Sequence, residues 1–174
     1  MSAANANPFE PIDFALRVCE STAFCIHAIL AITEPCTGCL RRYAFREGGD
    51  KGGMPHWFWP IAGVLLLIVA AANFSRNEIA IFAAQAYIAA FHSGAVFYHL
   101  ILGHHPATGC APGFFVVMAF FVMWIRTAVW VALIVTFVSI LVAKGLSSCL
   151  VTPPASKDGG RNTRDSYLLG RMEA

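Results

Sequence analysis

Charged residues are scarce in this chain: they make up 13% of its 174 residues, against 57% hydrophobic residues, and the mean hydropathy is +0.63. Soluble domains carry about 25% charged and about 45–50% apolar residues, so this composition excludes an ordinary soluble domain. Long basic runs are also missing, and 12 basic residues nearly balance 10 acidic ones, so we expect no nucleic-acid partner. The composition predicts an integral membrane protein in contact with the lipid bilayer.

Basic residues are absent from the first 13 residues, in which the acidic residues are Glu10 and Asp13. A secretory signal peptide begins with a basic segment, and a transit peptide is rich in arginine, so we expect neither of them here. We interpret residues 1–13 as a polar leader that precedes the membrane segments.

Four apolar segments follow the leader, and a helix crosses a bilayer with about 20 residues. The expected spans are residues 14–33, 56–74, 79–102 and 114–143. They predict an all-α fold, a polytopic four-helix membrane bundle over residues 14–146 with a polar tail over residues 147–174. The last segment would be about 45 Å long as one helix, and we expect it to tilt or protrude rather than to form a fifth span.

Four spans would leave both termini on one side of the membrane. The basic residues on that side would be Arg76, Lys144, Lys157, Arg161, Arg164 and Arg171, and those on the other side Arg41, Arg42, Arg46 and Lys51. Because basic residues favour the cytoplasmic side, this distribution favours termini on the cytoplasmic-type side. Which membrane holds the protein does not follow from this pattern.

Polar residues recur inside the apolar segments, where they are costly and usually face the bundle interior. The candidates are Arg17, Glu20, His27, Gln85, His92, His99 and Arg126. Helical spacing places those of the first span on one face and those of the third span at seven-residue intervals. Glu20 and Arg126 also fall at similar depths, so we expect them to meet. The set either holds the helices together or lines a site for a proton, a quinone or a lipid.

Thiols gather where the first span meets its loop. Cys36 and Cys39 form a CxxC motif, and Cys110 lies in a loop expected on the same side. Three histidines are expected at helix ends on that side: His56, His104 and His105. The CxxC could cycle between dithiol and disulfide with Cys110 as the resolving thiol, supply two zinc ligands together with these histidines, or form a structural disulfide or inert thiols. The spacing does not decide between these alternatives.

Two short motifs resemble those of a known family. They are P-x-x-G-x-x-L from Pro60 to Leu66 and A-x-x-x-H-x-x-x-G-H from Ala95 to His104. Over about residues 12–135 the chain resembles the DoxX-like superfamily of small four-helix membrane proteins. The resemblance implies a mixed range of functions: subunits of quinone-linked thiosulfate or sulfur oxidation, disulfide-dependent enzyme maturation, and assembly chaperones of membrane receptors. The chain departs from the family pattern at Leu66, where several relatives have Glu, and at His105, where an acidic residue often precedes the proline.

The expected function is that of a non-catalytic accessory or assembly subunit of a larger membrane complex. Small residues on the third span, such as Ala83, Ala89 and Gly94, favour close helix approach. The alternative is a quinone- or thiol-linked membrane redox protein that uses Cys36 and Cys39, and a small transporter is a third class. No cofactor is predicted, although a quinone or a lipid is compatible with the polar residues.

Overall fold

The structure is a computed structural model that describes residues 8–37, 54–55 and 57–151. Within these ranges the elements are helical: α1 (Glu10–Thr37), α3 (Phe58–Ala72), α4 (Glu78–Ile101), the short 3-10 helix η1 (Pro106–Gly109), α5 (Cys110–Arg126) and α6 (Val129–Leu150). Four helical segments are long and apolar enough to cross a membrane, with η1 and α5 counted together, and α3 is a shorter apolar helix of 15 residues. The expected all-α, multi-pass membrane fold is confirmed.

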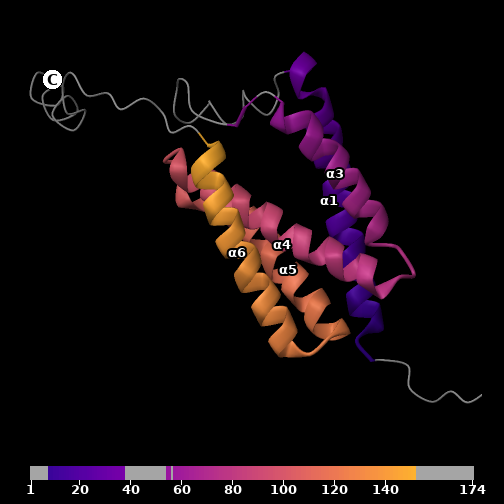
Figure 1. The fold of residues 1–174 in the computed structure, drawn as a ribbon. Coiled ribbons are helices and arrows are strands. Elements are labelled where there is room, and N and C mark those ends of the chain that lie inside the picture. Colours follow the sequence, from indigo (N-terminus) through magenta and orange to yellow (C-terminus); the bar gives the residue numbers. More distant parts are fainter. Residues whose placement is uncertain (1–7, 38–53, 56, 152–174) are drawn as a thin grey trace, which may run out of the picture.

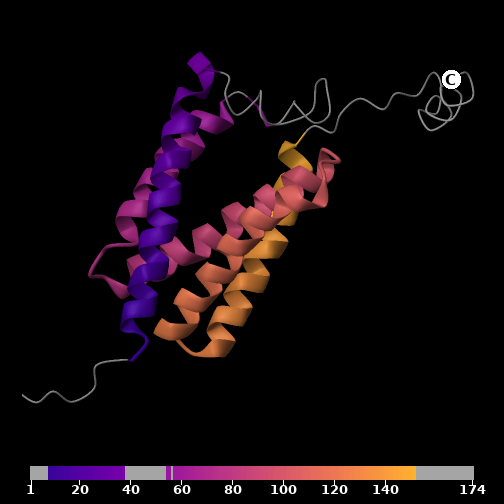
Figure 2. The same ribbon diagram turned by 180° about the vertical axis from the view of Figure 1, so that it is seen from behind.

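The helices form two groups, an α1–α3 pair and an α4–α5–α6 group (Figure 1). The two groups meet at the end of the molecule where α1 begins, and they diverge toward the other end, as the reverse view in Figure 2 also shows. We call the first end the charged end; it holds the start of α1, the turn between α3 and α4, and the junction between α5 and α6. The other end, with the C-terminal ends of α1, α4 and α6, is called the opposite end.

A single glycine sets the contact between α1 and α3. A Cβ atom on Gly63 would lie 2.7 Å from Ile32 Cγ1 and 2.9 Å from the carbonyl oxygen of Ala28. These distances are shorter than real Cβ contacts, so the two backbones touch where Gly63 meets α1. The pair is therefore a closely packed antiparallel hairpin.

Helix α6 packs on α4 through small residues. The buried residues of α6 are Ala132, Ser139, Ala143 and Ser147. Ser139 Oγ donates to the carbonyl of Ala86 at 3.3 Å, and Ser147 Oγ donates to that of Gly94 at 3.4 Å. Small side chains let two helices approach closely, and large apolar residues of α6 such as Trp130 and Phe137 stay exposed, as expected for a helix that faces lipid.

The last apolar segment is not the single helix expected over residues 114–143. Helix α5 ends at Arg126, Thr127 is extended with φ −136° and ψ −168°, and α6 begins at Val129. The carbonyl of Met123 accepts two hydrogen bonds from Thr127, one from its backbone N–H at 2.8 Å and one from its Oγ1 at 2.7 Å. The chain reverses here because Arg126 is held by an ion pair and α6 can then bury its small residues against α4.

Three other boundaries move outward from the expected ones. Helix α1 begins at Glu10, so Asp13 belongs to its first turns and not to a polar leader. The same helix continues to Thr37, which places Cys36 in its last turn instead of a loop. Helix α6 reaches Leu150, four residues into the expected polar tail. The polar side chains at these helix ends have a hydrogen-bond partner or are exposed. They therefore do not interrupt the helical hydrogen bonds of the backbone.

Asn77 caps the start of α4. Its Oδ1 accepts hydrogen bonds from the backbone N–H groups of Ile79 at 2.9 Å and Ala80 at 3.4 Å. Ser75 Oγ accepts in turn from the N–H of Asn77 at 3.0 Å. Asparagine is a favoured N-cap because its side chain replaces a missing helical acceptor, and the sharp turn that follows α3 depends on this cap.

The first and last described helical ends lie at opposite ends of the molecule. Asp13, near the start of α1, contacts Arg126 at the charged end. Val151, directly after α6, packs with Tyr98 and Met54 at the opposite end. That both termini share one side of the membrane stays a prediction: the described residues contain five α-helices, four of them in candidate spans and α3 a shorter apolar helix.

Candidate functional site

One buried carboxylate organises the charged end. Asp13 is 1% exposed, and its two oxygens accept hydrogen bonds from Arg126 Nε and Nη2, both at 2.7 Å. Arg17 Nε and Nη2 also reach Asp13 Oδ2, each at 3.0 Å. The bidentate contact from Arg126 is the strong geometry for an arginine–carboxylate pair, and it ties α1 to the end of α5.

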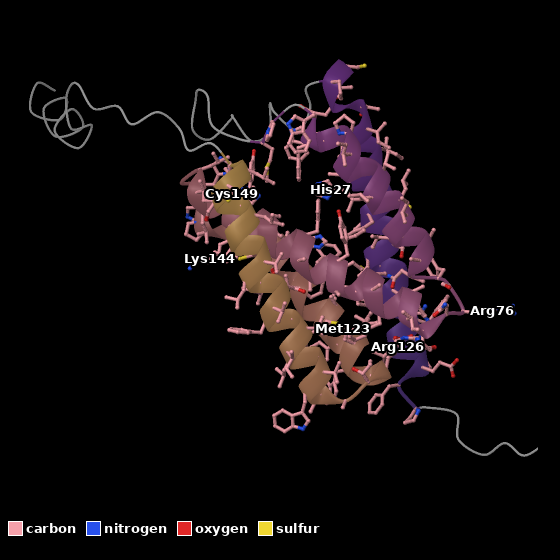
Figure 3. All side chains as sticks on the ribbon, viewed as in Figure 1. His27, Arg76, Met123, Arg126, Lys144 and Cys149 are labelled. Atoms are coloured by element: carbon pink, nitrogen blue, oxygen red, sulfur yellow. The ribbon has the colours of Figure 1, made fainter. Side chains whose placement is uncertain are left out.

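Glu78 adds a second carboxylate to Arg126. Arg126 Nη1 donates to Glu78 Oε2 at 2.5 Å, and the Glu78 side chain is 72% exposed. The two carboxylates therefore hold Arg126 from a buried and an exposed side. Figure 3 shows Arg126 close to Met123, where α4, α5 and α1 come together.

Two fully buried amides and one fully buried carboxylate, which we call the amide layer, lie next to these ion pairs. Glu20, Asn73 and Gln85 are each 0% exposed, and they come from α1, the end of α3 and α4. Gln85 Nε2 donates to Glu20 Oε2 and to Asn73 Oδ1, both at 2.7 Å, and Asn73 Nδ2 donates to Glu20 Oε2 at 3.1 Å. These contacts connect the α1–α3 pair with α4 in the interior of the bundle.

Arg17 connects this amide layer to the ion pairs. Its Nη1 donates to the backbone carbonyl of Asn73 at 2.6 Å, one of the groups that the end of α3 leaves without a helical partner. Asn73 Nδ2 also donates to Ser21 Oγ at 3.2 Å. Arg17 is buried and binds the end of α3 and Asp13 at the same time, so removal of either contact would leave a charge with too few partners.

Two oxygen atoms within the amide layer have no hydrogen-bond partner: Glu20 Oε1 and Gln85 Oε1. The orientation of the Gln85 amide follows from its neighbours, because a flipped amide would turn its carbonyl oxygen toward two acceptors. Buried polar atoms are rarely left unpaired, and each such atom costs about 1–3 kcal/mol.

A pocket of about 420 Å³ opens beside Gln85, between α4, α5 and the start of α6. It is lined by Glu78, Ile79, Phe82, Gln85, Met123, Arg126, Thr127 and Val131. Its walls are mainly apolar, with the Arg126–Glu78 pair and Gln85 as polar groups. The volume falls within the range of small-molecule sites, which is about 300–1,000 Å³.

Four of the expected polar-core residues do meet: Arg17, Glu20, Gln85 and Arg126 contribute to one connected network. The expected direct pair of Glu20 and Arg126 is wrong, because Arg126 binds Asp13 and Glu78 while Glu20 binds two amides. Arg126 ends its helix level with Asp13, and Glu20 lies seven residues further along α1, a rise of about 10 Å.

The sequence interpretation missed Asp13 and Asn73. Asp13 had a usable signal, since it precedes Arg17 by four residues and so lies on the same helix face. Asn73 had none, because its place in the network depends on where α3 ends against α1.

His27 and His92 lie further from the charged end, in an aromatic layer between α1 and α4. The ring of His92 stacks on Phe115 with centroids 4.5 Å apart, and its Nδ1 donates to the carbonyl of Ile88 at 3.0 Å. His27 contacts Phe91 edge to face at 6.4 Å and points from α1 toward α4 (Figure 3). These two histidines do not join the ion-pair network.

His99 lies at the opposite end of the molecule and not in the polar core. Its Nδ1 is 2.8 Å from Nδ1 of His104, within hydrogen-bond distance. His105 Nδ1 accepts from the N–H of Ala107 at 3.2 Å and so caps η1, and His56 lies outside the described residues. Across residues 8–37, 54–55 and 57–151, no group of three or more His, Cys, Asp and Glu side chains is placed to hold a metal ion.

The thiols of the expected redox set are only partly described. Cys36, in the last turn of α1, and Cys110, at the start of α5, are exposed, and neither forms a disulfide with another of the cysteines that the structure describes. Both belong to helix ends at the opposite end of the molecule. Cys39 lies outside the described residues, so the pairing of the CxxC motif stays a prediction.

Comparisons with protein-family models, with curated proteins and with solved structures find no match to this chain. The DoxX-like resemblance of the two short motifs therefore stays a prediction.

Proposed function

We propose that this protein is a non-catalytic accessory or assembly subunit of a larger membrane complex. The main support for this role is that the charged groups at the charged end bind one another: Asp13 binds Arg17 and Arg126, and Arg126 binds Glu78. Charges arranged in this way hold helices together, since each one satisfies a neighbour within the chain. The network supports a rigid scaffold that binds the α1–α3 pair to the α4–α5–α6 group.

The outer face of α6 is the surface that we assign to the partner. Its small residues are used against α4, while Trp130, Ile134 and Phe137 are 71%, 64% and 62% exposed. Aromatic side chains are enriched at protein interfaces, where they bury a large area with little loss of side-chain freedom. A membrane partner would replace lipid on this face without disturbing the charged end.

Purification from native membranes in a mild detergent tests this role. We expect the protein in a stoichiometric complex, and we expect Trp130→Ala with Phe137→Ala to reduce co-purification several-fold at an unchanged protein level. The matched control is Ile26→Ala with Ile29→Ala, which truncates two exposed apolar residues of α1. Recovery of the protein as a small free particle would contradict the accessory role, as would equal losses in the two double variants.

The redox alternative is supported by the exposed thiols of Cys36 and Cys110 at one end of the molecule. Under the accessory role, Cys36→Ser and Cys39→Ser leave function and protein level unchanged. Loss of function with a normal protein level, together with bound quinone or a reducible Cys36–Cys39 disulfide, would favour a membrane oxidoreductase instead.

We also propose that the chain crosses the membrane five times, with its termini on opposite sides. In this topology nine basic residues belong to the side of the opposite end: Arg41, Arg42, Arg46, Lys51, Lys144, Lys157, Arg161, Arg164 and Arg171. The other side has Arg76 in the α3–α4 turn, with Arg17 and Arg126 in helices. The asymmetry is greater than with four spans, and it favours a cytoplasmic-type C-terminus and an N-terminus across the membrane.

Reporter tags at each terminus test this topology in sealed vesicles. We expect a protease added outside to remove one tag and to leave the other until detergent is added. A cysteine introduced by Arg76→Cys in a cysteine-free background should be labelled from the same side as the N-terminal tag. Removal of both tags from one side would show an even number of crossings.

A further inference from the structure

We propose that the pocket beside Gln85 binds a neutral, membrane-soluble alcohol whose hydroxyl group donates a hydrogen bond to Gln85 Oε1. The pocket of about 420 Å³ lies between α4, α5 and α6, and this ligand site is separate from the accessory role. Two observations point to it independently: an apolar pocket within the membrane part of the chain, and a fully buried acceptor on its wall that lacks a donor.

The Gln85 amide explains why the missing group is a donor. Its nitrogen donates to Glu20 and Asn73, neither of which lines the pocket. The carbonyl oxygen of the same amide, Oε1, has no hydrogen-bond partner. Gln85 is 0% exposed, so a hydroxyl group that enters the pocket reaches this oxygen once the side chains that cover it shift, and it then satisfies the oxygen and leaves the network behind it unchanged.

The charges around the pocket select a neutral head group. Arg126 on the pocket wall is already paired with Glu78 and Asp13, so the wall offers no unpaired charge to an ionic head group, and Glu20 behind Gln85 disfavours an anion. A hydroxyl group donates a hydrogen bond without carrying a charge, and it costs less than an ion to move from water into an apolar site.

The remaining walls suit an alkyl body. Ile79, Phe82, Met123 and Val131 supply the apolar lining, and Met123 is a flexible side chain that adapts to an irregular ligand. Gln85 lies seven residues into α4, so the hydroxyl group would sit about 10 Å inside the start of that helix. The ligand would therefore enter from the lipid and place its head group inward.

Photo-crosslinking in liposomes with a long-chain alcohol that carries a diazirine tests the site. We expect the crosslinks, mapped by mass spectrometry, to fall on Phe82, Met123 or Val131. Unlabelled 1-decanol should compete about tenfold better than decyl methyl ether, because the ether accepts but cannot donate a hydrogen bond. Equal competition by the two compounds would overturn the assignment of the hydroxyl group to Gln85.

Two variants separate the pocket from general lipid contact. Val131→Phe fills the pocket without touching the polar network and should reduce the labelling at least fivefold, whereas Val138→Phe, on an exposed part of α6 outside the pocket, should leave it unchanged. In Gln85→Leu the advantage of the alcohol over the ether should disappear. If this variant fails to fold, the comparison of Val131→Phe with Val138→Phe still decides the outcome, and equal labelling in those two variants would overturn the site.

Discussion

Replacement of Asp13 by asparagine is expected to lower the free energy of unfolding by about 3–5 kcal/mol, because it leaves two arginines without their shared carboxylate. Arg17 is buried, and the Arg126 side chain is 19% exposed, so neither charge is readily solvated. The change keeps the shape of the side chain, and the loss therefore reports the charge. Unfolding in mixed detergent micelles, titrated with SDS and followed by circular dichroism, measures it.

Glu78→Gln is the matched control for Asp13→Asn. It also removes a carboxylate partner of Arg126, but the Glu78 side chain is 72% exposed, so water replaces the lost contact. Exposed ion pairs contribute about 0–1 kcal/mol, and we expect a loss within that range. Equal losses in the two variants would show that burial of Asp13 does not matter, contrary to the structure.

A double-mutant cycle between Asp13 and Arg126 measures the pair itself. Arg126→Gln should cost less than Asp13→Asn, because Asp13 keeps its contact with Arg17. The double variant should lose less free energy of unfolding than the sum of the two single losses. Each single variant already breaks the contact between Asp13 and Arg126, so the second change does not break it again. Additive losses would mean that α1 and α5 are not joined through these residues.

Gly63→Ala is the second change with a large expected effect. The new methyl group would lie 2.9 Å from the carbonyl oxygen of Ala28 and 3.0 Å from the backbone nitrogen of Ile32, so α1 must move away from α3. Overpacking of this kind costs about 1–3 kcal/mol. The melting temperature of the purified protein in detergent, measured by fluorescence-detected size-exclusion chromatography, should fall accordingly.

Gly94→Ala provides the control on the same chain. Its added methyl group would meet Ser147 Oγ at 3.7 Å, which is ordinary van der Waals contact. Alanine also favours a helix over glycine by about 0.5–1 kcal/mol, so this variant should be as stable as the parent or slightly more so. A similar fall in the melting temperature for both variants would contradict the close contact assigned to Gly63.

The comparison of the α4 and α5–α6 regions shows what local sequence can predict. Helix α4 was predicted within one residue at each end, since it has a polar turn with an Asn77 cap before it and Gly103 after it. The break at Thr127 has no glycine or proline to mark it, and its only sequence signals are Arg126 and a length of about 45 Å, too great for one crossing. Local patterns alone therefore predicted one helix over this segment, where the structure has two.

Composition and periodicity by themselves determined that this is a helical membrane protein with polar residues turned inward. These properties follow from the solvent preference of each side chain and from the spacing of residues along a helix. Only the tertiary structure decided that Arg126 binds Asp13 instead of Glu20, that Asn73 joins the network, and that His99 lies at the opposite end. Partners between helices depend on where each helix ends and how closely two backbones approach, and these features arise only when the chain packs against itself.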